Sequence, residues 1–574
     1  MKNNNEEYTL KIKELEQTIN SQSGETSHFN VFCSEAGLGK SRETLRIVDE
    51  SFDDWNNSNR YLIVKKFKKD VEEAVEYLSH RNKTGFLNIL GVTSENWIQW
   101  KTKYEKLRDV RVMIITHQRY IDLCLNDEIR HAFVENRNVL IIDEKIKFPT
   151  YTFSKAIYDQ VRSMLHTSIQ QEYDKVCNKL LIELQKHEFE KKKNKVIRCK
   201  LKIHPATLRN FINLMNTNIE NENDIRIKNA LRNFIAGLNQ WYSTKCLYNA
   251  GNISTFNHKH KLWGLQKNII LDASAYIDNV YKLGNFKLFG HERIISHSNS
   301  HFTIINFNTS KSSLRLNQSE FNAEISKKIN NSYKVNDKTL IICHKDNHKL
   351  ILEQLYKVGI TRIGVGDEYD GEDFAINWFG NLIGKNEYSK FTQCWIIGTP
   401  NIPYEQYLID YMMYRETDLG RKSTDIKLGR FVNDKFKAVQ IGYIASEIYQ
   451  SIKRIQRNQM PQGEFFIVNS DQEVLNTVLS QIKDANKVNK IEMEFQQIKK
   501  SKEHDNVEKF LDYFSSLPKG MYKKKDIFFK ALGITNNFNR ILTDARIQAL
   551  LSVEGGIGLG VLKIHNKHIE KLVD

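Results

Sequence analysis

The sequence predicts an α/β protein with two parallel-sheet domains, a helical insertion in the first domain and a small separate unit at the C-terminal end. Short apolar runs alternate with helical segments between residues 28 and 150, and the same alternation returns after about residue 320. This is the pattern of β-α-β units around a parallel sheet. A length of 574 residues also exceeds what a single hydrophobic core usually supports.

Composition limits the classes of protein to consider. Hydrophobic residues make up 40% of the chain, too much for a disordered protein. The 85 Lys and Arg exceed the 69 Asp and Glu, and this net charge of +16 makes nucleic acid the leading partner class. The sequence has no uncharged apolar window of roughly 18 to 20 residues and no apolar signal core, so we expect a cytoplasmic protein without membrane contact.

The cysteines do not indicate a cross-linked or metal-binding framework. There are seven of them, and none forms a C-x-x-C pair. A disulfide scaffold, a zinc site and an iron-sulfur cluster would each need paired or clustered cysteines. We therefore expect reduced cysteines with mainly structural roles.

The order of the patterns predicts the domain boundaries. Charged helical segments interrupt the first alternating set, and a strand-like run, NIILDASAY, then resumes it. The second set contains TLIICHKD, TRIGVG and QCWIIGTP. We expect a polar leader over 1–27, a first domain over 28–150 with 263–315, a helical basic insertion over 151–262, a second domain over 316–470, a charged helical linker over 471–504 and a C-terminal unit over 505–574.

The segment SEAGLGKS lies between an apolar run and a helix, and it differs from G-x-x-x-x-G-K-[ST] only at Ser34. Gly37 and Gly39 would let backbone N–H groups approach phosphates at a helix N-terminus. Lys40 would reach the β and γ phosphates of ATP, and Ser41 would ligate Mg²⁺. The alternative is a strand-to-helix turn rich in small residues. The expected phosphate contacts are Ser34, Gly37, Leu38, Gly39, Lys40 and Ser41.

Farther along the chain, VLIIDE places Asp143 and Glu144 at the end of a predicted buried strand. Adjacent carboxylates at this position are costly unless they have a partner at the sheet edge. Asp143 would hold Mg²⁺, and Glu144 would orient or deprotonate the attacking water. An ordinary strand-ending acidic pair is the alternative for this motif alone. The two motifs in this order predict ATP hydrolysis.

With these motifs in place, residues of about 28 to 468 resemble superfamily 2 helicases and translocases. Thr116 in IITHQRY resembles the threonine that meets the nucleic-acid backbone in this family. Asp272 and Ser274 in ILDASA resemble motif III, which couples nucleotide state to the second domain. IICHKD resembles motif IV, and Gly384 and Asn386 in FGNLIGKNEYSKF resemble the coupling motif V. The resemblance implies two RecA-like P-loop domains.

The segment EIYQSIKRIQR resembles motif VI, Q-x-x-G-R-x-x-R, with Lys453 in the place of the usual glycine. Gln450, Arg454 and Arg457 fall at i, i+4 and i+7, so we expect them on one face of a helix. They would meet the nucleotide, and one arginine would act as an arginine finger on the γ-phosphoryl group. A basic surface helix is the alternative.

Contacts to nucleic acid are expected to fall mostly on phosphates, with little reading of sequence. Besides Thr116, the basic stretch of the insertion offers Lys191 and Arg198 for such a track. A solvated charged face explains this stretch equally well.

The C-terminal unit over 505–574 is predicted to contain three helices followed by a glycine-rich hairpin, the order found in winged-helix domains. FNRILTDARIQALL would be its third helix, carrying Arg540 and Arg546, and Lys523 would contact the backbone. The alternative is a winged helix that docks a protein.

These predictions together favour an ATP-dependent helicase or translocase that uses Mg²⁺ and acts on nucleic acid, with DNA favoured over RNA. The Asn, Lys and Ile richness suggests an AT-rich source genome, and the divergent motifs suit a mobile element, with roles in replication, repair or defence. One alternative is an ATP-switched loader or assembly protein that does not unwind a duplex and docks protein partners through the insertion or the winged helix. Another is a sequence-specific replication initiator or regulator.

Overall fold

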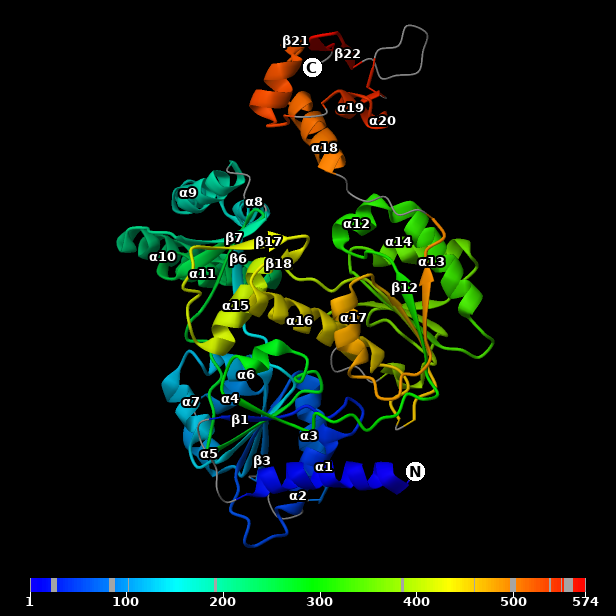
Figure 1. Cartoon of the computed structure of the whole chain (residues 1–574). Coiled ribbons are helices and arrows are strands. Elements are labelled where there is room, and N and C mark those ends of the chain that lie inside the picture. The colour runs from blue at the N-terminus through cyan, green and yellow to red at the C-terminus, as the bar shows by residue number, and fades with distance from the viewer. Residues whose placement is uncertain are drawn as a thin grey trace. The chain divides into compact units, whose positions relative to one another are not determined.

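The computed structural model of the chain describes residues 2–21, 28–81, 88–101, 103–189, 194–382, 387–458, 460–495, 502–535, 538–548, 550–551 and 561–572. The chain divides into two compact units. The first unit comprises Met1–Asn306 and Ser326–Glu492, and the second comprises Phe307–Ile325 and Met493–Asp574. Both parallel sheets lie in the first unit (Figure 1).

The first sheet has seven strands, all parallel to their neighbours. Its central strands are fully buried apolar runs such as YLIV, VMII and VLII, as a sheet covered on both faces requires. The spatial order of the strands is β11 (Phe286–Phe289), β1 (Phe29–Phe32), β10 (Lys267–Leu271), β5 (Val139–Asp143), β2 (Tyr61–Lys65), β4 (Val112–Thr116) and β3 (Ile89–Val92). The predicted strands β1, β2, β4, β5 and β10 are confirmed, whereas β3 and β11 were not predicted.

Helices around this sheet include the N-terminal segment that the sequence suggested was a leader over 1–27. Leu15 and Ile19 of α1 are buried in one cluster with Ile47 and Val71, so the helix completes the core of the first domain. Residues 22–27 lie outside the described part of the chain. The helices are α1 (Lys2–Asn20), α2 (Lys40–Glu50), α3 (Lys68–Arg81), α4 (Trp97–Trp100), α5 (Tyr104–Asp109), α6 (His117–Asp122), α7 (Asp127–Val134) and the 3₁₀ turn η1 (Asn279–Lys282).

The second sheet also has seven strands in parallel pairing. In spatial order they are β14 (Ile363–Val365), β15 (Phe374–Trp378), β13 (Thr339–Cys343), β16 (Gln393–Ile397), β19 (Glu464–Val468), β12 (His301–Asn306) and β20 (Val488–Glu492). The helical segments in this part of the chain are α13 (Gln318–Ser332), which begins in the second unit, α14 (His348–Lys357), η2 (Glu387–Lys390), α15 (Tyr404–Arg415), α16 (Asp434–Ile452) and α17 (Gln472–Leu479). Helix α15 packs against the insertion and η1, and its buried side chains belong to the core of the first domain.

Two strands of this sheet depart from the boundaries that we expected. Strand β12 falls in the range 263–315 assigned to the first domain, but Phe302 pairs with Phe465 of β19. Strand β20 falls in the range 471–504 expected to be a linker, and it pairs with β12. Strand β20 is a largely exposed edge strand without an apolar run, and the sequence of β12 does not encode its partner, so only the tertiary pairing decides which sheet each one joins.

The insertion contains a sheet as well as the predicted helices. Its helices are α8 (Lys155–Met164), α9 (Thr167–Phe189), α10 (Pro205–Asn221) and α11 (Ile225–Ser243). They share a core with the antiparallel strands, centred on Tyr173, Phe234 and Trp241. Those strands are β6 (Thr150–Phe153), β7 (Lys195–Lys200), β8 (Lys245–Asn249) and β9 (Asn252–Phe256). The lysine-rich flanks of β7 obscured its strand pattern in the sequence.

This sheet is extended by β17 (Ser423–Lys427) and β18 (Arg430–Phe431), which lie between α15 and α16. The Arg198 N–H donates to Lys422 O over 2.9 Å, and the Ile426 N–H donates to Asn194 O over 2.8 Å. In Figure 1 the helices α15 and α16 accordingly run between the insertion and both parallel sheets. The insertion is therefore bonded through its backbone to a segment that follows the second-domain strand β16.

The second unit contains α12 (Lys311–Leu316), α18 (Lys502–Ser515), the π-helical turn η3 (Asp526–Ala531), α19 (Phe538–Leu542), α20 (Ala545–Gln548) and an antiparallel sheet of β21 (Gly520–Lys523), β23 (His568–Lys571) and β22 (Leu562–Ile564). Phe510, Phe528, Ile547 and Ile569 are buried in its core. The single helix expected over FNRILTDARIQALL is divided into α19 and α20 by a turn at 543–544.

All seven cysteines are buried free thiols. In the described part of the chain, no helix combines the length and apolar character needed to span a membrane.

The pairing of β17 with β7 leads to a first prediction. Thr424 is buried and lies opposite Val196, so Thr424→Pro removes a backbone donor from the strand pair. We expect the amides of Val196 and Arg198 to exchange hydrogen about tenfold faster or more, because their partner strand is displaced. Hydrogen exchange measured by mass spectrometry or NMR tests this expectation.

Thr424→Val is the matched control because it keeps the N–H group and the branched side chain. Unchanged exchange over residues 195–200 in Thr424→Pro would contradict the pairing.

Candidate nucleotide site

The SEAGLGKS segment forms the turn between β1 and α2. Gly37 and Gly39 have φ values of 91° and 72°, in the left-handed region that glycine adopts without strain. Gly39 is the N-cap of α2, and among the described side chains none caps this helix end. A helix N-terminus in this state offers N–H groups and a positive dipole end to an anion.

Lys40 folds back over this turn. Its Nζ donates to the backbone oxygens of Ser34 and Glu35, the latter over 3.0 Å. Burial is the main cause that lowers the pKa of Lys40, to about 8, with Asp272 and Asp143 opposing the shift. Phosphate oxygens would compensate this buried ammonium better than two neutral carbonyls do.

The carboxyl ends of the parallel strands bring Ser41 and Asp143 together. Asp143 is the last residue of β5, and the Ser41 Oγ donates to its Oδ1 over 2.8 Å. Lys65, at the end of β2, donates to the Oδ2 over 2.7 Å. Burial opposes ionisation of Asp143, but Lys65 and Ser41 outweigh it and lower the pKa of this carboxyl. A hydroxyl beside an ionised carboxylate is an oxygen donor set that fits Mg²⁺.

Glu144 follows in a left-handed backbone conformation with a φ of 70°. Its N–H donates to Leu271 O over 3.0 Å, which fixes this turn against β10. The carboxylate Oε2 lies 3.4 Å from the Nζ of Lys66. Burial raises the pKa of Glu144, while Lys66 opposes the shift. A carboxylate with a raised pKa is a stronger base than an exposed one.

Asp272 and Ser274 lie directly after β10 at the same edge of the first sheet. The Ser274 N–H and Oγ donate to Asp272 Oδ1 over 2.9 and 2.7 Å, and the Tyr281 hydroxyl donates to Oδ2 over 2.8 Å. Gln450 Nε2, from α16, donates to Ser274 Oγ over 3.0 Å. The predicted motifs III and VI are therefore joined by a hydrogen bond.

The two motif VI arginines lie near Gln450, but not on one helical face as we expected. Helix α16 ends at Ile452, and Arg454 and Arg457 lie in the turn that follows, where Gln456 has a φ of 47°. Arg454 Nη2 donates to Gln450 Oε1 over 3.3 Å. A Cβ built at Gly37 would lie 3.7 Å from the Arg457 Cβ, so this arginine borders the phosphate-binding turn.

Several cations therefore gather beside this turn. Burial lowers the pKa of Arg457 to about 10, and Arg454 adds to the shift. Burial also lowers the pKa of Arg454, with Glu144 opposing it. Together with Lys40 and Lys66, these groups form a site that a polyphosphate would stabilise.

Sequence reasoning missed several charged residues of this cleft. Lys65 and Lys66 follow the apolar run YLIV and contact Asp143 and Glu144. Two lysines directly after a buried strand are a signal in the sequence by which this part of the site could have been found. Glu35 is a fully buried charge inside the phosphate-binding turn. Its partner Lys453 is the residue that departs from the motif VI pattern.

The predicted nucleic-acid contacts are dispersed. The Thr116 Oγ1 accepts the Arg119 N–H over 3.1 Å as the N-cap of α6, at the same sheet edge as Asp143. Lys523 and Arg540 are exposed in the second unit. Gly384, Asn386 and Lys191, and the side chain of Arg546, lie outside the described residues.

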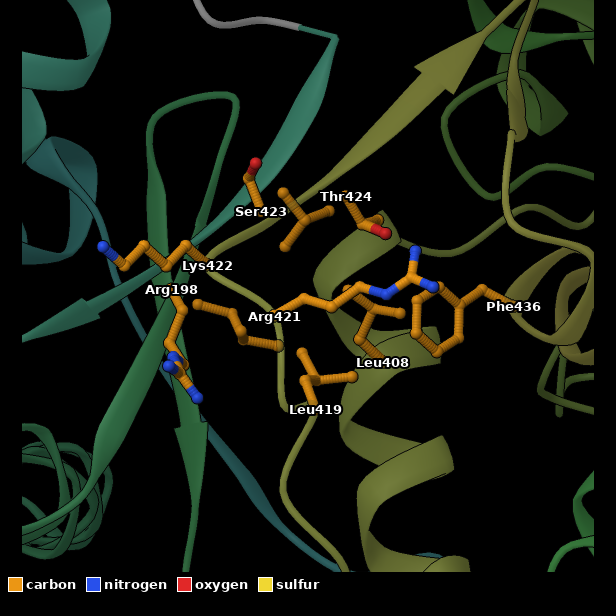
Figure 2. Close-up of a pocket in the computed structure, with 10 residues that line it drawn as sticks. Arg198, Leu408, Leu419, Arg421, Lys422, Ser423, Thr424 and Phe436 are labelled. Atoms are coloured by element: carbon orange, nitrogen blue, oxygen red, sulfur yellow. The ribbon is translucent and has the colours of Figure 1, made fainter.

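Arg198 lies on β7 and pairs with Asp418 over 3.2 Å. It borders a small cavity where β7 and β8 meet the segment 419–424 and the helices α15 and α16. Figure 2 shows the Arg421 side chain running alongside Leu408 toward Phe436 in this cavity. Apolar groups form much of its lining. The cavity is therefore a packing defect where the insertion meets the segment 419–424, rather than a second polar site.

Comparison with known proteins supports the fold. No family model and no curated protein sequence matches the chain. A solved apo structure of XPD matches with a TM-score of 0.54 at 14% identity, covering 84% of this chain and all 100% of that one. Xpd4 from S. tokodaii matches with a TM-score of 0.51 at 10% identity, covering 84% of this chain and 99% of that one. The chain shares the fold of these two structures.

Proposed function

We propose that this protein is a nucleic-acid-stimulated ATP hydrolase of the helicase or translocase type. The observation that carries the proposal is the convergence of Lys40, the Ser41–Asp143 pair and Glu144 with Arg457, which follows a helix of the second domain. Opposite charges from two parallel-sheet domains meet at one phosphate-binding turn. This arrangement suits hydrolysis of a nucleoside triphosphate between two domains.

Each group has a distinct role in this mechanism. The turn 34–41 and Lys40 bind the phosphates. Ser41 and Asp143 would hold Mg²⁺, which would supply neutralisation of phosphate charge. Glu144 accepts a proton from the attacking water, since its raised pKa increases its basicity. Arg454 and Arg457 stabilise the charge that develops on the transferred phosphoryl group.

Coupling to nucleic acid follows from the contact between Gln450 and Ser274. ATP binding favours the closed cleft in which this contact forms, and product release allows it to open. A strand held along the domains would then be moved stepwise. Thr116, Arg198, Lys191, Lys523, Arg540 and Arg546 are the candidate phosphate contacts, and Gly384 and Asn386 are further candidates for coupling.

The net charge of +16 favours a polyanionic track, and we propose DNA and a cytoplasmic location. The winged-helix-like unit would bind duplex or junction DNA. A non-unwinding loader shares the same ATP site, so strand displacement on a tailed duplex separates the two functions. The loader would hydrolyse ATP without displacing a strand.

ATP hydrolysis at about 50 mM salt tests the proposal, because phosphate contacts weaken steeply by about 200 mM. We expect stimulation by single-stranded DNA, and Lys40→Ala and Glu144→Gln should each lower kcat about 100-fold or more. Steady-state assays with no polymer, single-stranded DNA, duplex DNA or RNA measure this effect.

Lys69→Ala, on the exposed face of α3, is the matched control and should leave the rate unchanged. Hydrolysis that ignores every polymer would favour the loader. Hydrolysis that persists in Lys40→Ala would contradict the assigned site.

The pH dependence gives a separate prediction for Glu144. The base must be ionised, so activity is lost as pH falls through its pKa, which burial raises above that of an exposed glutamate. Removing Lys66 removes the charge that opposes this shift, so Lys66→Met should move the acid limb of kcat/KM to higher pH.

Rate profiles between about pH 5 and 9 for the parent and Lys66→Met measure this shift. An acid limb that stays in place or moves to lower pH would exclude Glu144 as the titrating base.

A further inference from the structure

A buried ion pair joins the phosphate-binding turn to the segment after α16. Lys453 Nζ donates to Glu35 Oε1 over 3.0 Å, and the two side chains are 6% and 0% exposed. Glu35 lies within SEAGLGKS, and Lys453 is the C-cap of α16. Removing two charges from water is costly, so an ion pair in this position needs further hydrogen bonds to compensate its lost hydration.

That compensation comes from the segment between β11 and β12. The N–H groups of Ile294 and Ile295 donate to Glu35 Oε2 over 2.7 and 2.8 Å. Lys453 Nζ also lies 2.9 Å from His297 Nε2. Burial and Lys453 lower the pKa of His297 to about 3, so this ring is neutral and its Nε2 accepts from the ammonium. Its Nδ1 then carries the proton, 3.2 Å from Ser300 Oγ.

The same two residues hold the phosphate-facing cations through their backbone. Glu35 O accepts from Lys40 Nζ over 3.0 Å, and Lys453 O accepts from Arg457 Nε over 3.0 Å. The ion pair therefore fixes two carbonyls, one on each side of the cleft. Each carbonyl orients one cation that the proposed hydrolysis requires.

We propose that Glu35 and Lys453 are positioning residues that set the register between Lys40 and Arg457 and hold the two domains together at the nucleotide cleft. This inference rests on the proposed ATP hydrolysis. Lys453, which replaces the motif VI glycine, and Glu35, in the phosphate-binding turn, therefore act together as one ion pair. A buried ion pair stabilises the folded protein little more than a neutral pair of similar volume would. We therefore expect this pair to affect the positions of Lys40 and Arg457 rather than the free energy of unfolding.

The test compares the parent with Glu35→Gln, Lys453→Met and the double variant. Each single change leaves one buried charge without its partner, so we expect lower thermal stability and a kcat reduced about tenfold or more. The double variant is neutral, and its Gln side chain still offers an oxygen to Ile294 and Ile295. We expect its melting temperature to recover toward that of the parent while its kcat remains about tenfold low and KM changes little.

A matched control is the ion pair of Lys437 and Glu473, which joins α16 to α17 on the surface. Lys437→Met with Glu473→Gln should leave both melting temperature and kcat near those of the parent.

A second readout does not depend on hydrolysis. All seven native cysteines are buried, so spin labels at Glu73→Cys and Lys349→Cys can report the distance between α3 and α14. We expect one narrow distance distribution in the parent and a broader one in the neutral double variant, both without nucleotide.

The outcomes separate the two proposals. A double variant with parental kcat and a parental distance distribution would overturn the positioning role while leaving the ATP hydrolase intact. A parent that hydrolyses no ATP would refute the proposed function. A distance distribution that broadens in the double variant would then still support the link between the domains.

Discussion

The candidate nucleotide site between the two parallel-sheet domains depends on compensation of buried charge. Lys40, Lys65 and Arg454 are cations removed from water, and each would be costly without a nearby anion or carbonyl. Asp143 and Glu144 supply part of the compensation, and they come from the edge of one sheet. A polyphosphate would supply the remainder, so charge balance connects the architecture to the proposed chemistry.

Parallel pairing explains why residues distant in the sequence meet at this edge. Phe32 is aligned with Leu271, and Leu271 is aligned with Asp143. The phosphate-binding turn, the acidic pair and the Asp272 turn therefore all leave the sheet at the same level. Because every strand runs in the same direction, each βα turn falls at the carboxyl edge. The second domain contributes Arg454 and Arg457 to this site from the segment that follows α16.

The insertion is tied to the segment after β16 as well as to the first sheet. Strand β17 pairs with β7, and Glu405 of α15 is buried 3.4 Å from Ser254 of β9. Burial raises the pKa of Glu405 to about 7. The insertion and the segment after β16 are therefore linked by backbone pairing as well as by a side-chain contact.

The sequence by itself determined strands β1, β2, β4, β5 and β10 of the first sheet and β13, β14 and β16 of the second. It also determined the phosphate-binding turn and the Asp143–Glu144 pair, because apolar runs and short motifs are local signals. It could not assign β12 or β20 to a sheet, since β20 is a largely exposed edge strand and a strand's sequence does not encode its partners. Nor could it show that α16 ends before Arg454, with Lys453 as its C-cap and as the partner of Glu35. Tertiary structure decided these features, since each depends on groups that are distant along the chain and meet only after the two domains pack.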